Sequence, residues 1–309
     1  MNAPVEFTAP AAEQAVLRSL LRGVLRVLFR GLVRPPMPIA GQRLVIRLLT
    51  AVSPPQRGVA RTAESLGGRP CEWHRPAQPR GSVLLYLHGG AFLIGAPHTH
   101  RAICGSLARR GQFEVCALDY RLAPEFRYPA ARDDAVAAYQ ALLASGYRAE
   151  QIVIGGDSAG GNLSLITCLR LRDLGLPLPA ALVCFSPVTD FTGEHLHNPP
   201  AGDPLIHPKW VEQAIGLYCP ANVARSDPGL SPLFADLQGL PPLLLQVGED
   251  EILLNDSLRF VEQAQAAGVQ VRLERYPGLW HVFQAHAGML KAADFALGRV
   301  VGFLRERGC

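Results

Sequence analysis

The chain has 309 residues, 49% of them hydrophobic and 18% charged, which is enough for one large α/β domain or two smaller ones with a sizeable core. The formal net charge of +4 is modest, and beyond the N-terminus the arginines are scattered, so nothing argues for nucleic-acid binding. No segment reaches the roughly 20 continuous apolar residues of a membrane span, and the arginine-interrupted start does not read as a signal peptide. Seven widely spaced cysteines indicate reduced thiols, with only Cys309 expected to be exposed, and predict a cytoplasmic protein.

Residues 13–32 are predicted to form a strongly amphipathic basic helix. Arginines recur every fourth residue among apolar ones, which is the spacing of two helix faces. The apolar set is Val16, Leu17, Leu20, Val24, Leu28 and Leu32, and the basic set is Arg18, Arg22, Arg26 and Arg30. Such a helix either packs its apolar face on the protein or lies on a membrane surface and gives a weak membrane contact.

Beyond this helix, proline clusters at 35–38 and 53–55 predict a linker, and apolar segments then alternate with helical ones. This βαβ rhythm predicts a mostly parallel sheet flanked by helices. Strands are expected near 82–87, 113–118, 151–155, 180–185, 242–247 and 271–276, and helices near 99–110, 130–144 and from 162 to about 174. The stretch from 190 to about 229 breaks the rhythm and holds a short helix near 209–218.

A serine stands in the Gly156–Gly161 segment, Gly-Asp-Ser-Ala-Gly-Gly, between a predicted strand and a predicted helix. Glycines that flank such a sharp turn avoid clashes and lift the hydroxyl of Ser158 to the top of the sheet. An ordinary strand-to-helix turn is the alternative. A serine nucleophile also needs a base and hydrogen-bond donors for the oxyanion. The donors are predicted to be the backbone N–H groups of Gly89 and Gly90, which follow a buried strand, and of Ala159.

The base is predicted to be His281, which follows the last strand and a Pro-Gly turn. His286 falls in the next helical pattern and is expected at the surface. The histidine pairs 98/100 and 195/197 lack a third ligand at familiar spacing, so neither a metal nor any cofactor is predicted. The acid that orients His281 should follow the strand 242–247, where the 248–257 loop offers four carboxylates.

Together these segments resemble the bacterial hormone-sensitive-lipase-like (family IV) esterases of the α/β-hydrolase superfamily. The resemblance rests on His88–Ala91, on Asp119–Glu125, on the serine turn, and on the loops 248–257 and 278–283. The family commonly has a third glycine where this chain has Ala91. The register of its acid loop, matched on Leu253 and Asp256, implies that Glu251 is the acid, with Asp250 as the rival.

The resemblance implies an α/β-hydrolase fold with a helical cap. Residues 1–50 would supply cap helices and a linker, 51–309 the core, and about 190–229 a second part of the cap. It also favours packing of the 13–32 helix over the active site. The expected activity is that of a serine carboxylesterase acting on small, uncharged esters of short to medium acyl chains. A lactone hydrolase and a non-catalytic ligand-binding protein on a hydrolase scaffold are the alternatives. A homodimer could form through an exposed edge strand at the C-terminal side of the sheet.

Overall fold

The computed structural model describes residues 5–8, 14–50 and 56–309. Within these residues nine strands form one sheet in the order β1-β9-β8-β7-β6-β4-β5-β3-β2. Their bounds are β1 Val5–Thr8, β2 Val59–Leu66, β3 Arg69–Pro76, β4 Val83–Leu87, β5 Glu114–Leu118, β6 Ile152–Asp157, β7 Ala181–Phe185, β8 Leu243–Gly248 and β9 Val271–Tyr276. Only the β2–β3 and β3–β5 pairs are antiparallel, so the prediction of a mostly parallel sheet is confirmed.

Each strand predicted from the sequence is present within two residues of its expected bounds. Most of those strands could be recognised because helices cover both sheet faces and bury largely apolar residues, whereas β9 also contains Arg272, Glu274 and Arg275. In β4 all five residues are buried. β2 and β3 were not predicted, because six of the eight β2 residues are exposed and an apolar alternation is missing. The four-residue β1 is too short to carry a pattern.

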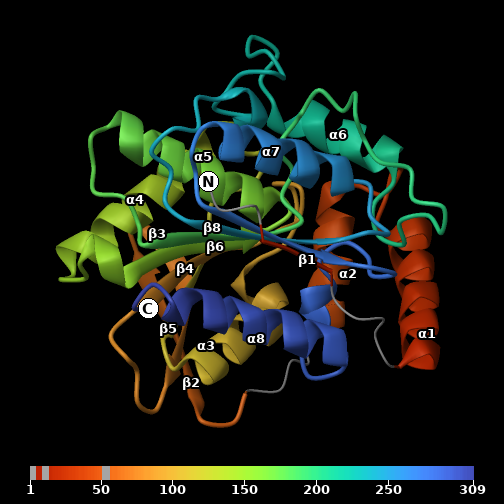
Figure 1. Cartoon of the computed structure of the whole chain (residues 1–309). Helices are drawn as coiled ribbons and strands as arrows, with labels where there is room; N and C mark the ends of the chain where they lie inside the picture. The colour runs from red at the N-terminus through yellow and green to blue at the C-terminus, as the bar shows by residue number, and fades with distance from the viewer. Residues whose placement is uncertain (1–4, 9–13, 51–55) are drawn as a thin grey trace.

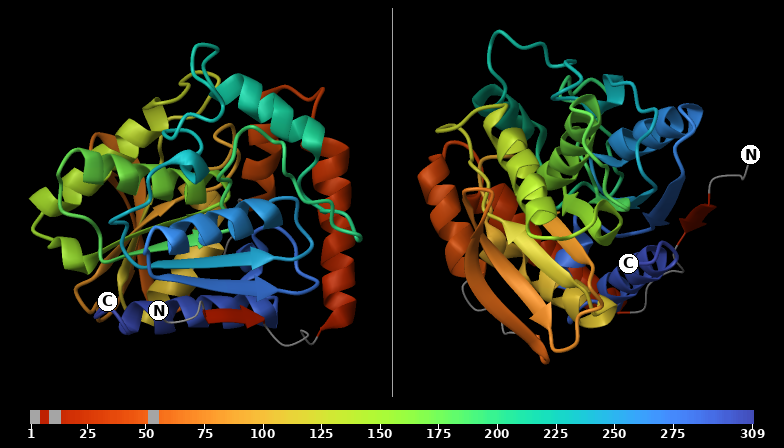
Figure 2. Two further views of the ribbon diagram at one scale, coloured as in Figure 1. Left: turned by 45° about the horizontal axis from the view of Figure 1, so that its top comes forward. Right: turned by 90° about the vertical axis from the view of Figure 1, so that its left-hand side faces the viewer.

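Helices cover both faces of the sheet (Figure 1). One face carries α4 (Ala130–Ala144), α5 (Ala159–Asp173) and α7 (Leu254–Ala266), and the other carries α3 (Arg101–Gly111) and α8 (Lys291–Arg305). The right-hand view of Figure 2 shows the strong twist of the sheet between these layers. β6 lies in the middle of the sheet, between β7 and β4, and all six of its residues are buried between the two helix layers. The turn that follows β6 is therefore central in the molecule.

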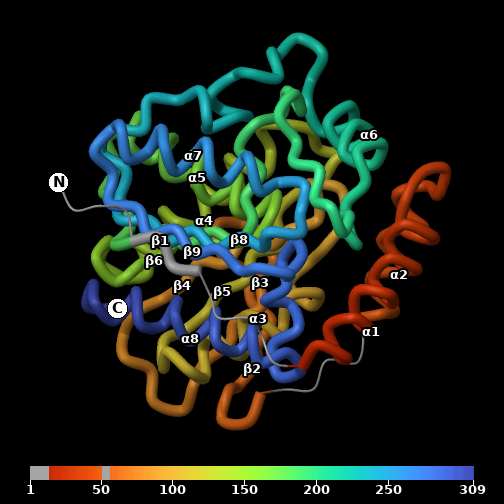
Figure 3. Tube along the Cα trace, turned by 45° about the vertical axis from the view of Figure 1, so that its right-hand side comes forward, coloured from red at the N-terminus to blue at the C-terminus, as the bar shows by residue number. Residues whose placement is uncertain are grey.

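The N-terminal segment forms α1 (Ala15–Leu25), a π-helical continuation (Arg26–Leu32) and α2 (Ile39–Thr50). Figure 1 and Figure 3 show α1 and α2 at the same end of the sheet. A linker was expected where α2 stands, so that expectation is wrong for 39–50, and its second proline cluster, 53–55, lies outside the described residues. The indole Nε1–H of Trp210, in α6 (Pro208–Tyr218), donates to Oε1 of Gln42 in α2 at 3.0 Å. The 190–229 segment is thereby joined to the N-terminal helices.

α1 does not turn all of its apolar side chains toward the core, as a simple amphipathic helix would. Leu25 is buried, but Val16, Leu20 and Val27 are 84%, 65% and 69% exposed. On the inner side, the guanidinium of Arg22 donates to the Asp250 carboxylate and to the Gly278 carbonyl. The helix is apolar over a wide arc, so part of that arc stays in solvent while arginines reach acceptors on the core.

Two further expectations are corrected at the ends of the chain. β1 pairs in parallel with β9, so β9 is not the exposed edge strand that was expected at the C-terminal side of the sheet. Cys309 is buried, with 7% of its surface exposed, because its thiol lies against the Glu150 carbonyl oxygen at 3.6 Å. All seven cysteines are free thiols.

Candidate active site

Ser158 lies at the turn between β6 and α5 with a strained backbone, φ 54° and ψ −118°. A residue other than glycine rarely adopts a positive φ, and such strain is common where a side chain must be presented for chemistry. The turn is anchored because the Ser158 N–H donates to the Phe185 carbonyl at 2.8 Å. A Cβ on Gly156 or on Gly160 would overlap the Leu87 carbonyl oxygen, so the flanking glycines are required by close packing against β4.

His281 and Glu251 lie together at the same edge of the sheet. His281 Nδ1 is 3.2 Å from Glu251 Oε1, and both side chains are buried. The other oxygen of Glu251 accepts from the Ser186 hydroxyl at 2.6 Å and from the Gly248 N–H at 3.0 Å. Burial by itself would lower the pKa of His281, but the Glu251 carboxylate outweighs it and raises that pKa. The arrangement fixes one imidazole nitrogen and leaves the other available.

Asp250, the rival acid, points elsewhere. Its carboxylate forms an ion pair with Arg22 of α1, and its N–H donates to the Leu279 carbonyl at 2.9 Å. The backbone bends over residues 249–251, and of the two carboxylates only that of Glu251 reaches His281. Asp250 therefore holds α1 against the His281 loop.

In the glycine loop after β4, the Gly89 N–H does not point to the oxyanion position that was expected for it. The Gly89 N–H donates to Oδ1 of Asp157 at 3.1 Å, so a buried carboxylate already occupies it. The N–H groups of Gly90, Ala91 and Ala159 make no such bond within the described residues. The prediction for Gly89 is at odds with this hydrogen bond, while Gly90 and Ala159 remain open donors and Ala91 joins them.

A buried ion pair stands behind this loop and was missed by the sequence analysis. Nε2 of His100 lies 3.2 Å from Oδ2 of Asp157, whose Oδ1 also accepts from the Tyr86 hydroxyl at 2.6 Å. Thr99 gives its hydroxyl proton to the Ala96 carbonyl, so the Thr99 oxygen accepts from Nδ1–H of His100. The Asp157 carboxylate favours the protonated form of the His100 ring. Burial opposes this charge, but Asp157 raises the pKa of His100 above its usual value.

His88 holds the loop from its other side. Its Nδ1 lies 2.8 Å from the Gly89 carbonyl oxygen, and its own carbonyl accepts from the Tyr120 hydroxyl at 2.5 Å. Burial lowers the pKa of His88 to about 3, so the ring is neutral and Nδ1–H donates. Because a trans peptide points its N–H opposite to its C=O, this grip on the Gly89 carbonyl also fixes the direction of the Gly90 N–H.

A cavity of about 390 Å³ joins these groups, since Gly90, Ala91, Ser158 and His281 all line it. Its remaining walls are mainly apolar and come from the N-terminal helices and from the 190–229 segment. The former supply Leu25, Leu28, Phe29, Ile46 and Leu49, and the latter Leu205, Ile206 and Trp210. The predicted nucleophile and base, and the predicted donors Gly89 and Gly90, thus line one mainly apolar pocket.

Comparison with known proteins agrees with this geometry. Residues 84–285 match the family model described as the alpha/beta hydrolase fold. The chain belongs to the α/β-hydrolase fold family. A solved esterase from the bacterial hormone-sensitive lipase family is 38% identical, covers 95% of this chain and 99% of its own, and superposes with a TM-score of 0.89. The chain is a member of this hormone-sensitive-lipase-like branch.

Among curated proteins, this hydrolase is similar to an esterase of Acinetobacter venetianus, with 42% identity over 72% of this chain and 74% of that protein. It is also similar to an acetyl-hydrolase of Streptomyces hygroscopicus, with 38% identity over 78% of this chain and 81% of that protein. Its family and these relatives identify the chain as a carboxylic ester hydrolase.

His286 was expected at the surface of the hydrolase, and the structure shows it partly exposed but in the wall of the catalytic cavity. It ends the short helix η5 (Phe283–His286) and lines the catalytic cavity, with its ring against the edge of buried Trp280. The sequence signal was available, because His286 lies five residues after His281 on the same loop. It was misread because the intervening residues look like the start of an exposed helix.

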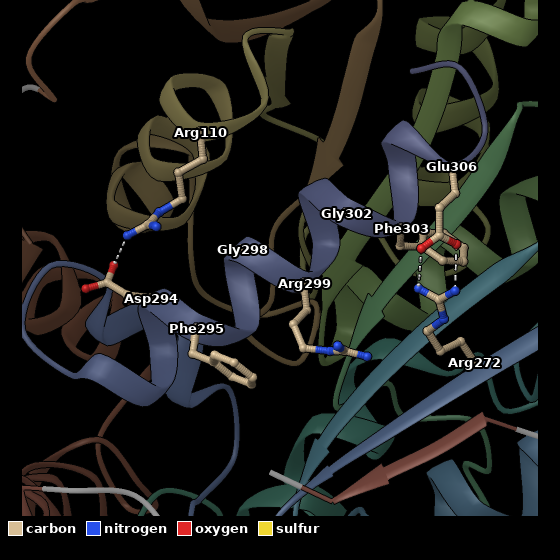
Figure 4. Close-up of a pocket in the computed structure, with 9 residues that line it drawn as sticks. All are labelled: Arg110, Arg272, Asp294, Phe295, Gly298, Arg299, Gly302, Phe303 and Glu306. Atoms are coloured by element: carbon tan, nitrogen blue, oxygen red, sulfur yellow. Dashed lines mark hydrogen bonds and ion pairs between the residues drawn. The ribbon is translucent and has the colours of Figure 1, made fainter. Parts of the chain in front are cut away.

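A second hollow of the hydrolase, of about 440 Å³, lies along α8, and none of the predicted site residues lines it (Figure 4). Arg110 pairs with Asp294 at 2.7 Å and Arg272 pairs with Glu306 at 2.6 Å across it. Arg299 is held by Glu274 at 2.6 Å. Each of these charges already has its partner, so the catalytic pocket is the better candidate for chemistry.

Proposed function

We propose that the enzyme hydrolyses uncharged carboxylic esters through an acyl-enzyme on Ser158. The Ser158 Oγ attacks the ester carbonyl while Nε2 of His281 takes its proton. The oxyanion accepts hydrogen bonds from the N–H groups of Gly90, Ala91 and Ala159. The protonated His281 gives the proton to the leaving alkoxide, and a water then repeats the attack on the acyl group with His281 as its base. The observation that carries this proposal is the buried pair of His281 Nδ1 and Glu251 Oε1 beside a cavity that Ser158 also lines.

The pocket supports short to medium acyl chains. Its walls are mainly apolar and its volume is about 390 Å³, at the lower end of ordinary ligand pockets. The test is a series of p-nitrophenyl esters from acetate to dodecanoate, with γ- and δ-lactones in parallel. We expect kcat/KM to peak at short to medium length and to exceed that for the lactones by at least about tenfold. Preference for a lactone would favour the alternative activity. No turnover of any ester would leave the ligand-binding alternative.

The pH profile should report the pairing of His281 with Glu251. Only the neutral imidazole accepts the Ser158 proton, so kcat/KM falls as pH drops through the pKa of His281. Because Glu251 raises that pKa, we expect the acid limb above the pH at which an ordinary histidine titrates. In Glu251→Gln the burial remains and the carboxylate is lost, so the limb of the residual activity should move to lower pH.

The control for this profile is Asp250→Asn, which removes a charge one residue away that does not contact His281. Its acid limb should stay where the unaltered enzyme has it. If Glu251→Gln does not shift the acid limb, the proposed effect of Glu251 on the pKa of His281 is contradicted.

We also propose that α1 and α2 touch a lipid surface while the pocket works. Val16 and Leu20 on α1, Val27 on its π-helical continuation and Leu48 on α2 are each at least 65% exposed, and other residues of these helices line the catalytic pocket. The exposed Arg34 and Arg47 would add attraction to anionic lipid. No helix of the described part of the chain is long and apolar enough to cross a membrane. Seven free, buried thiols favour the cytoplasm as the compartment.

Vesicles of anionic phosphatidylglycerol test the lipid contact. The double variant Leu20→Ser and Val27→Ser should lower co-sedimentation at least about tenfold, because two exposed apolar side chains lose burial in lipid. Its kcat/KM for soluble p-nitrophenyl acetate should stay within about twofold. Phe295→Ser, an exposed apolar residue of α8, is the matched control and should bind like the unaltered protein. The unaltered enzyme could instead fail to bind vesicles and sediment as a dimer. If the double variant then sediments as a monomer, this face belongs to the predicted homodimer interface.

A further inference from the structure

His286 has a fixed position in the wall of the catalytic pocket. Its ring centroid is 5.6 Å from that of Trp280 at an interplanar angle of 74°, and Trp280 Nε1 lies 3.4 Å from His286 Nε2. Trp280 is fully buried, and the Arg22 guanidinium lies 5.8 Å from the centroid of its ring. A large buried side chain therefore contacts one nitrogen of His286 while the residue still lines the pocket.

The indole contact determines the tautomer of His286. An indole N–H donates and never accepts, so Nε2 of His286 must present its lone pair to it. Burial lowers the pKa of His286 to about 4, which keeps the ring neutral at pH 7. A neutral imidazole carries one proton, so this proton is on Nδ1.

Among the hydrogen bonds of the described residues the His286 ring contributes only Nε2, and its Nδ1 is not one of the fully buried unpartnered atoms, so Nδ1–H is accessible. The other hydroxyls of the pocket wall are engaged, because Thr50 donates to the Ile46 carbonyl at 2.8 Å and Thr99 to the Ala96 carbonyl at 2.7 Å. His100 and Asp157 are bound to each other, and Ser158 and His281 carry the reaction. Among the described side chains that line the pocket, His286 is thus the one with a spare donor outside the catalytic groups.

We propose that His286 is a specificity residue whose Nδ1–H donates to a second oxygen of the substrate. The substrate class would be esters that carry an ether, ketone or hydroxyl oxygen in the acyl or the alcohol part, besides the ester group itself. A purely hydrocarbon chain against His286 would leave a desolvated N–H without a partner, which costs free energy in every complex with such a chain. The inference rests on the proposed esterase function of the same pocket.

Two isosteric substrate pairs test this inference and distinguish the two parts of the substrate. For the alcohol part, 2-methoxyethyl acetate is compared with butyl acetate, and for the acyl part, ethyl 3-methoxypropanoate with ethyl pentanoate. The measured quantity is the ratio of kcat/KM for the oxygen-containing ester to that for its hydrocarbon partner. In His286→Phe we expect this ratio to fall about three- to tenfold for one of the two pairs, as expected for one hydrogen bond. Intrinsic reactivity cancels because both enzymes receive the same substrates.

Two further variants separate selectivity from general damage. His286→Asn carries an amide N–H near the position of Nδ1 and should restore most of the ratio. His195→Phe changes an exposed histidine that does not line the pocket, and should leave both ratios unchanged. If the unaltered enzyme hydrolyses the hydrocarbon esters and His286→Phe alters neither ratio, the inference is wrong and the esterase function stands. If no ester is hydrolysed, both are wrong.

A spectroscopic measurement checks the tautomer without reference to activity. In protein labelled with ¹⁵N-histidine, the signal missing from the His286→Asn spectrum belongs to His286. It should show a proton on Nδ1 and none on Nε2 between pH 6 and 8. A proton on Nε2, or an imidazolium in this range, would overturn the inference.

Discussion

Replacing Ser158 by alanine is expected to lower kcat for p-nitrophenyl acetate by about 10⁴- to 10⁶-fold, and replacing His281 by alanine should cost about as much. The serine loses the only atom that can form the acyl-enzyme, and without the imidazole the hydroxyl keeps its proton. The double variant should be no more than about tenfold worse than either single one, because the two groups act as a unit. Ser158→Ala should keep the fold, since alanine leaves the strained turn and its hydrogen bonds to Phe185 and Asn162 in place.

Circular dichroism and the thermal midpoint provide the control for folding in these variants. Substantial residual activity in a folded Ser158→Ala enzyme would contradict the mechanism. Effects that multiply in the double variant would mean that Ser158 and His281 do not work on the same step.

Glu251→Gln is expected to lower kcat by about 10³- to 10⁴-fold, as loss of a triad carboxylate does. The amide can still accept from Ser186 and Gly248, but it no longer stabilises the imidazolium that forms as His281 takes the proton. Asp250→Asn should cost less than about tenfold in kcat, a difference of over about 2 kcal/mol in barrier between the two variants. Its effect should appear mainly in KM, because Asp250 holds Arg22 and with it the helix whose Leu25 and Leu28 line the pocket.

Arg22→Gln is the matched control for Asp250→Asn, since it breaks the same ion pair from the α1 side. The two variants should show the same rise in KM, and the double variant should add little to it. A large loss of kcat in Asp250→Asn, with a mild effect in Glu251→Gln, would transfer the acid role to Asp250. Two mild effects would mean that neither carboxylate orients His281.

The sequence was most informative where structure is local or buried on both sides. The strands β4 to β8 and the serine turn could be predicted because largely apolar runs and flanking glycines follow directly from a covered parallel sheet. β2 could not, because its residues are mostly exposed and its pairing with β3 supplies the pattern instead. α2 was hidden by the prolines on both sides of it and by Gly41 in its first turn.

The parts of the site that escaped prediction depend on contacts between distant segments. Arg22 faces the core because it pairs with Asp250. The two residues are 228 positions apart in the sequence, so helical periodicity alone cannot show the pairing. Gly89 was assigned a donor role because glycine spacing does not reveal which N–H a carboxylate occupies. The carboxylate of Asp157, in the serine turn, accepts from the Gly89 N–H. Asp157 also pairs with His100, 57 residues away in the sequence, and this pairing is visible only in the fold.

The most direct measurement of the central claim is the intact mass of the enzyme, with peptide mapping, after rapid quenching with p-nitrophenyl butyrate. The account predicts one butyryl group per chain on the peptide that contains Ser158, formed with a stoichiometric burst of p-nitrophenol and absent from Ser158→Ala. Non-specific acylation is easy to recognise, because the sequence has only two lysines, Lys209 and Lys291. Turnover without a covalent adduct, or a transient adduct on any other side chain, would contradict the proposed mechanism.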